Sequence, residues 1–188
     1  MNILKVFVLL ITGGAALVGF ELSAHVHSER WKVKTLADSF AVNSIAVPTT
    51  IPDQAALPEP SVGESVARLP SEKTLYTLDA RLIAVKKEFD GDYHLVLEDP
   101  RTKLRMVAEI PDTSTPAPLA DRKDYAVARE EIDRIAGRPG FFAKKLVTPP
   151  MIEIAGIGFF DEPHMLTPDG MAPNGREIHP VLRVKPIL

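Results

Sequence analysis

The sequence predicts a mostly β (α+β) fold: a small, partly open barrel of five strands with one helix between the third and fourth, formed by residues 71–188. Three observations lead to this prediction. Three consecutive segments alternate apolar and polar residues, one later segment has helical periodicity, and two more strand-like segments follow it. Residues 71–188 are numerous enough to build one compact hydrophobic core.

The first three strands are predicted to form an antiparallel meander. Apolar residues alternate with polar ones along 76–84, which is the pattern of a strand with one buried face. The sequence DGD at 90–92 favours a tight turn, with Gly91 free to adopt a positive φ. Residues 93–98 and 104–110 continue the alternation on either side of a second turn.

The next segment, DRKDYAVAREEIDRIAG at 121–137, has apolar residues at helical spacing. We expect Asp121 to cap the start of this helix and Gly137 to end it. The order of strands and helix resembles the OB-fold, in which a helix lies between the third and fourth barrel strands.

Two strands complete the predicted barrel. The largely apolar segment 151–162 is the fourth strand, in which Gly156 and Gly158 indicate a bulge or a close backbone approach. Residues 177–184 form the fifth strand. Because Pro180 has no backbone N–H to donate, we expect that strand to lie at an edge of the sheet.

The N-terminal residues predict export. Lys5 precedes the uncharged, mostly apolar run 6–20, which is shorter than the roughly 20 residues of a membrane-spanning helix and suits a signal peptide. Residues 1–24 are therefore expected to be a signal peptide, or an N-terminal anchor if they are not cleaved. The corresponding location is periplasmic or secreted, or anchored in the inner membrane of a bacterium. Residues 25–70, with several prolines, are expected to be a flexible tether.

Composition excludes several classes of site. The chain has no cysteine, so disulfides, thiol nucleophiles and cysteine metal ligands are absent. A net charge of -3 and an aromatic content of 6% disfavour nucleic acid as a partner. The lysine pairs 86–87 and 144–145 are interpreted as solvated strand ends, and membrane contact is expected only through residues 1–24.

Polar residues gather near the predicted strand ends and turns. Histidine with carboxylates is suited to binding a divalent metal or to acid–base chemistry. If the last two strands pair as a hairpin, the metal candidates are Asp161, His164, Glu177 and His179. The competing interpretation is structural, because Asp and Asn in turns commonly bond their own backbone.

Four motifs resemble a family of small, uncharacterised, often exported bacterial domains. They are DGDYHLVLEDP, MVAEIPD, GIGFFDEPH and APNGREIHPVLRV, which lie within residues 78–184. The resemblance singles out a candidate site of eight residues: Asp92, His94, Glu109, Asp161, His164, Asn174, Glu177 and His179. It implies no particular activity.

A second resemblance is to the opening strands of thermonuclease-type nucleases, which carry calcium-binding carboxylates on an OB barrel. Asp92 matches the first carboxylate of that pattern. The second motif departs from it, because Ile110 stands where an aspartate belongs and Asp112 matches only approximately. Arg105 alone does not supply the arginines that would hold a phosphate.

Two functions follow from these observations. The first is an exported module that uses its strand-end loops to bind an unidentified envelope ligand or protein. The alternative is a metal-dependent hydrolase of the nuclease or phosphodiesterase kind, using Asp92, Glu109 and the histidines. Only the hydrolase requires a divalent metal, and the sequence leaves open whether the protein is an enzyme.

Overall fold

The computed structural model describes residues 28–161 and 170–187, apart from the side chain of Leu119. The predicted signal segment 1–24 and His164 lie outside the described residues. The elements, in chain order, are α2 (Glu29–Lys34), β1 (Val47–Pro48), α3 (Ile51–Ala55), a 3-10 turn (Pro70–Glu72), β2 (Leu75–Lys87), β3 (Tyr93–Glu98), β4 (Arg105–Ile110), α4 (Leu119–Ala136), β5 (Lys144–Lys145), β6 (Met151–Phe160) and β7 (Arg176–Pro186).

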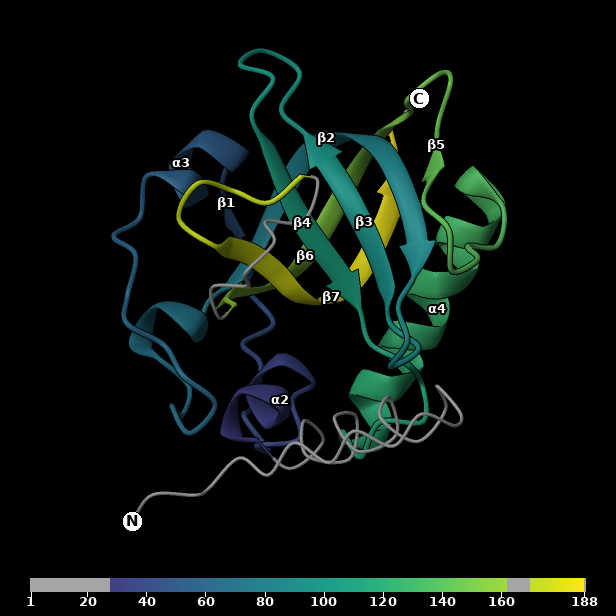
Figure 1. Cartoon of the computed structure of the whole chain (residues 1–188). Helices are drawn as coiled ribbons and strands as arrows, with labels where there is room; N and C mark the ends of the chain where they lie inside the picture. The colour runs from purple at the N-terminus through teal and green to yellow at the C-terminus, as the bar shows by residue number, and fades with distance from the viewer. Residues whose placement is uncertain (1–27, 162–169, 188) are drawn as a thin grey trace, which may run out of the picture.

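The principal feature is a closed barrel with the strand order β2-β3-β4-β7-β6, in which β6 also pairs with β2 (Figure 1). The 13-residue strand β2 closes the barrel, since one part of it pairs with β6 and another with β3. Strands β4 and β7 are parallel, and the other barrel pairs are antiparallel. This order, with α4 between β4 and β6, confirms the predicted mostly β, OB-like fold. The barrel is closed where the sequence predicted a partly open one.

The inner face of the barrel is apolar. Leu82, Leu95, Met106 and Ile110 are all completely buried within one continuous cluster. Tyr125 and Ile132 extend this cluster from α4. Burial of these side chains is the main source of stability in a chain without disulfides.

Strand β7 is not an edge strand, so that prediction is wrong. It lies between β4 and β6 and pairs with both. Pro180 is accommodated because the β4 pairing is confined to Glu177 and Ile178, while the β6 register shifts between Ala155 and Gly158. A Cβ on Gly156 would lie 2.4 Å from the Pro180 oxygen, which confirms the predicted close backbone approach.

Helix α4 begins earlier than predicted, and Asp121 is not its cap. Pro118 is the N-cap residue, and Asp121 lies within the first turn. Proline suits the start of a helix because it has no N–H that needs a partner there. Gly137, with φ of 73°, ends the helix as predicted.

Residues 28–70, which the sequence predicted to be part of a flexible tether, pack onto the barrel. Trp31, Val33 and Leu36 are buried, and Leu36 joins Ile157 in a second apolar cluster outside the barrel. The Arg30 guanidinium donates two hydrogen bonds to the Glu72 carboxylate, at 3.0 and 2.6 Å. Buried apolar residues of α2 therefore hold this stretch against the barrel, although prolines follow it in the sequence.

Among the described residues, no helix combines the length and apolar character needed to cross a membrane.

Candidate metal site

The candidate site lies on the outer face of β3, β4 and β7. Side chains alternate along a strand, so residues next to the core positions Leu95, Ala108 and Ile178 point outward. His94 is paired in register with Glu109, and Val107 with Glu177. The outer face of the second and third strands is also where OB-folds bind their ligands.

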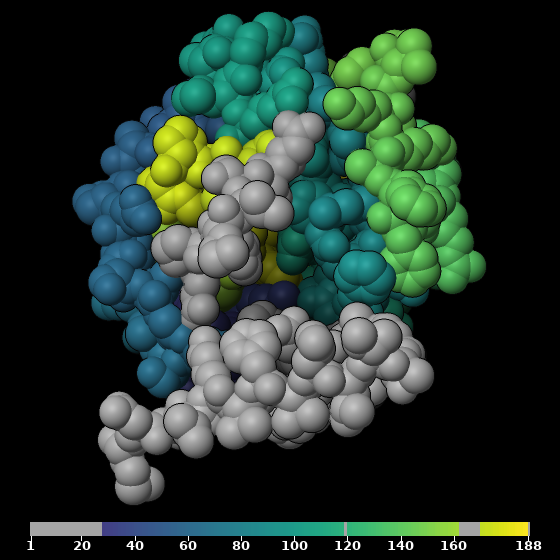
Figure 2. All heavy atoms as spheres, viewed as in Figure 1, coloured from purple at the N-terminus to yellow at the C-terminus, as the bar shows by residue number. Residues whose placement is uncertain are grey.

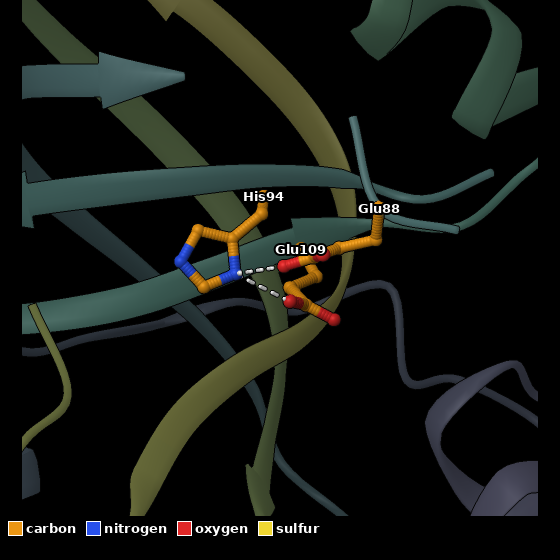
Figure 3. A group of neighbouring side chains, drawn as sticks. All are labelled: Glu88, His94 and Glu109. Carbon is orange, nitrogen blue, oxygen red and sulfur yellow. Dashed lines mark hydrogen bonds and ion pairs between the residues drawn. The ribbon is translucent and has the colours of Figure 1, made fainter. Parts of the chain in front are cut away.

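His94 and Glu109 form the centre of the first group. The His94 Nδ1 atom lies 2.7 Å from a Glu109 carboxylate oxygen and 3.3 Å from one of Glu88 (Figure 3). Both carboxylates face the same ring nitrogen, one from β4 and one from the turn between β2 and β3. The pair is largely buried, because the side chain of His94 is 6% exposed and that of Glu109 is 13% exposed.

His179 lies at the centre of the second group and is completely buried. Its Nδ1 atom is 3.1 Å from Glu177 Oε1 and 3.2 Å from Glu109 Oε2. Its other ring nitrogen, Nε2, is 3.5 Å from Asp92 Oδ2, beyond ordinary hydrogen-bond length, and is a buried atom without a hydrogen-bond partner. Glu109 therefore contacts both histidines, one through each carboxylate oxygen.

Lys34 brings a positive charge to this group from α2. Its Nζ lies 3.3 Å from Asp90 Oδ2 and 3.9 Å from Asp92 Oδ2. Burial alone would lower the pKa of Lys34, but the carboxylates of Asp92, Glu109, Asp90 and Asp161 raise it above its ordinary value. The ammonium group stays charged and partly neutralises the carboxylates beneath it.

The buried groups have strongly perturbed acidity. Burial raises the pKa of Glu177 to about 7, with the charges of Asp161 and Glu109 adding to the effect. Burial opposes protonation of His179, but the carboxylates of Asp92 and Glu177 raise its pKa to about 10. Burial also raises the pKa of Asp92, whereas His94 and His179 overcome burial and lower that of Glu109. Such opposed shifts among neighbouring groups are typical of functional sites.

Asp92, Glu109 and His179 have the chemistry of a metal-binding set. One ligand atom from each lies within 4.8 Å of the others. Ligands bound to one ion at about 2.1 Å lie roughly 3–4 Å apart, so small side-chain movements would complete the geometry. Metal-binding histidines commonly donate their second ring N–H to a carboxylate, and Glu177 is placed to accept from His179 Nδ1.

The structure brings together five of the eight predicted site residues: Asp92, His94, Glu109, Glu177 and His179. Asp161 follows β6 and is close enough for its charge to raise the pKa of Glu177. Asn174 does not join the group, because its side-chain amide donates to the carbonyl oxygens of Gln54 and Leu57 and holds α3. His164 lies outside the described residues.

Two participants were missed by sequence reasoning, Lys34 and Glu88. Lys34 was overlooked because residues 25–70 were interpreted as a tether, although the buried positions of α2 signal a packed helix. Glu88 follows the end of β2, beside the DGD turn that already contained a candidate. Of the predicted metal set Asp161, His164, Glu177 and His179, only His179 belongs to the set described above, and His164 lies outside the described residues.

No protein-family model matches this chain, and no curated protein matches it. Among solved structures, it is similar to a Leishmania major Friedlin protein described as an aspartyl-tRNA synthetase, with a TM-score of 0.40 and 11% sequence identity. The similarity covers 78% of this chain and 21% of that one, so this chain spans about a fifth of the other protein's length. A likeness this weak transfers no property, and the OB-like assignment rests on the strand order.

Proposed function

We propose that this protein is an exported OB-like binding module whose ligand at the outer face of β3, β4 and β7 is a divalent metal ion. The observation that carries the proposal is His179 Nε2, a buried nitrogen without a hydrogen-bond partner beside the carboxylate of Asp92. A buried polar atom without a hydrogen bond is costly, and a cation bound to it and to the adjacent carboxylate of Asp92 would remove that cost.

The donor set favours an ion that accepts both carboxylate and imidazole. Asp92 and Glu109 offer oxygen atoms and His179 offers one nitrogen. Zinc and manganese accept such mixed sets, and the absence of cysteine removes the ligands preferred by softer metals. The metal replaces the proton that His179 Nε2 carries in the metal-free protein.

The alternative, a metal-dependent hydrolase, is supported by one observation. Asp92, which matches the first carboxylate of the thermonuclease-type pattern, contributes to the metal set. A phosphate would also need a free guanidinium. Arg105 pairs with Glu98, and Arg30 pairs with Glu72, so both are engaged elsewhere. Binding without hydrolysis is therefore the function we favour.

The direct test is to titrate the EDTA-treated full chain with Mn²⁺ or Zn²⁺ while following the melting temperature. An ion at about 100 times its dissociation constant stabilises a fold by about 2.7 kcal/mol. For a chain of this size that corresponds to a rise of about 5–11 °C. Calorimetric titration with each metal should give one ion per chain.

Variants separate this site from adventitious binding. His179→Gln and Asp92→Asn should abolish the metal-induced rise, whatever their effect on the metal-free melting temperature. Glu98→Gln is the matched control, since Glu98 lies on the same outer face of β3 and pairs with Arg105. A rise retained in His179→Gln, or no rise with either metal in the unsubstituted protein, would refute the proposed site. A phosphodiester substrate incubated with the metal-loaded protein tests the hydrolase alternative.

A further inference from the structure

A second surface, next to the candidate site at Phe89, combines exposed aromatic rings with basic side chains. It consists of the loop between α4 and β5, strand β5 with the residues that follow it, and the turn between β2 and β3: Phe89, Arg138, Phe141, Phe142, Lys145 and Val147. Residues 137–150 contain three basic residues and no acidic one, in a chain whose net charge is -3. We call these six residues the aromatic-basic patch.

The apolar members are exposed to a degree that the fold does not require. Phe142 is 92% exposed and Val147 is 100% exposed, while Phe89 and Phe141 are 76% and 60% exposed. Phe89 and Phe141 stack on each other with ring centroids 5.7 Å apart. The stacked pair, with Phe142 and Val147 exposed on the same short segment of chain as Phe141, marks an interaction surface.

The patch is held in place at both ends. The N–H of Lys87 donates to the oxygen of Gly140 at 2.7 Å, and the N–H of Leu146 donates to the oxygen of Ile83 at 2.9 Å. Between these anchors, β5 pairs with β2 through Lys144 and Lys145. In Figure 2 the residues after α4, in light green, form one edge of the molecule. The backbone thus presents the phenylalanine pair at a fixed, projecting position.

We propose that the aromatic-basic patch docks onto an anionic lipid surface. Projecting phenylalanine and aliphatic side chains enter the boundary between headgroups and acyl chains, while neighbouring lysine and arginine attract anionic headgroups. Arg138 and Lys145 are exposed and flank the rings as this mode of binding requires. The proposal departs from the expectation that membrane contact is confined to residues 1–24.

Nucleic acid fits the patch less well. Single-stranded nucleic acid binds through open aromatic faces on which successive bases stack. Here Phe89 and Phe141 already cover one another, and Val147 offers no ring. The outer face of β3 and β4, where OB-folds bind oligonucleotides, carries buried carboxylates that repel phosphate.

The test places a fluorescent reporter in the patch of the full chain. Phe142→Trp adds an exposed indole to a protein whose single tryptophan, Trp31, is 8% exposed. With phosphatidylglycerol-rich vesicles, the emission of this variant should shift to shorter wavelength and be quenched by brominated acyl chains. Pure phosphatidylcholine vesicles and high salt should weaken the response. The matched control is Val127→Trp, since Val127 is also exposed, at 64%, but lies on α4 near Asp121 and Asp124.

A charge variant completes the experiment. Arg138→Gln with Lys145→Gln should weaken vesicle binding by about five-fold for each basic side chain removed. Both residues are exposed, so the melting temperature should stay unchanged. Equal responses from the two tryptophan variants would show attachment through another segment, such as residues 1–24, and would overturn the proposal. An absence of response at Phe142→Trp would do the same and would point to a protein partner.

Discussion

Strands β3, β4 and β7 have two faces of opposite chemistry. Toward the inside of the barrel they carry Leu95, Ala108 and Ile178, all buried in one apolar cluster. One residue along each strand, on the outer face, His94, Glu109 and Glu177 are almost as deeply buried. Burial of the apolar side chains of the inner face stabilises the protein, whereas burial of the polar side chains of the outer face costs free energy. A fold needs only the first kind of burial, and the second kind is the basis of the site proposed above.

Helix α2 packs beside the buried polar group of the outer face. The Arg30 guanidinium of α2 donates to the Glu72 carboxylate and lies over the Phe159 ring. The Phe159 and His179 rings pack in a T-shaped arrangement, with centroids 5.7 Å apart. Lys34, from the end of the same helix, approaches Asp90 and Asp92. The surroundings of the outer polar group therefore include residues that are distant from the barrel strands in sequence.

The largest expected effect on stability comes from breaking the ion pair between Arg30 of α2 and Glu72. Glu72→Gln leaves the buried guanidinium of Arg30 without its charged partner, which should lower the free energy of unfolding by about 3–5 kcal/mol. The Glu72 carboxylate also accepts from the backbone N–H groups of Leu69 and Phe160, so it fixes the barrel side of the contact. Urea unfolding measures the change.

Glu98→Gln serves as the comparison in that experiment, because Glu98 pairs with basic residues at the surface. Its replacement should change the free energy of unfolding by no more than about 1 kcal/mol. If the two variants were equally stable, the ion pair between Arg30 and Glu72 would not anchor α2.

A smaller but comparable effect is expected on the inner face. Leu95→Ala removes a completely buried side chain from the centre of the core and should cost about 2–5 kcal/mol. The loss should be the same with and without added metal, since the cavity faces away from the outer group. If the loss of unfolding free energy in Leu95→Ala changed when metal was added, the inner and outer faces would not be energetically independent. Urea unfolding with and without metal measures this loss.

The smallest expected effect is a change of stability with pH, which arises from Glu177 on the outer face. Glu177 binds its proton more tightly in the folded protein, with a pKa of about 7 against an ordinary 4.5. Its contribution to stability is complete below about pH 4.5 and is lost as the pH rises through 7. The groups that set this shift, besides burial, are Asp161, Glu109 and His179.

Glu177→Gln should therefore gain stability relative to the unsubstituted protein between about pH 5 and pH 8. Melting curves recorded in EDTA measure the gain, at about 2–4 °C for each kcal/mol. The pKa of His179 is raised to about 10 against 6.5, partly by Glu177, and its contribution is lost as the pH rises from 6.5 through 10, so the two proteins are compared below about pH 6.5. A constant difference between the two proteins across this range would show that Glu177 does not titrate there.

The order of the barrel elements was predictable because it depends on local patterns. Alternation along β2, β3 and β4 and the helical spacing of α4 report which face each segment buries. The position of β7 was not predictable from Pro180 alone, because a register shift in the neighbouring strand accommodates that residue. The packing of residues 28–70 depends on the buried side chains of α2, which the prolines of this stretch do not indicate.

By itself, the sequence determined the strands, the helix, and which polar residue types lie at the strand ends and turns. Only the tertiary structure decided that Asp92, Glu109 and His179 share one site, since these residues come from a turn and two strands that meet when the barrel closes. It also decided that Lys34 contributes and that Asn174 does not. The physical reason is that alternation assigns a side chain to a face from its neighbours alone, while proximity across a barrel depends on pairings between distant segments.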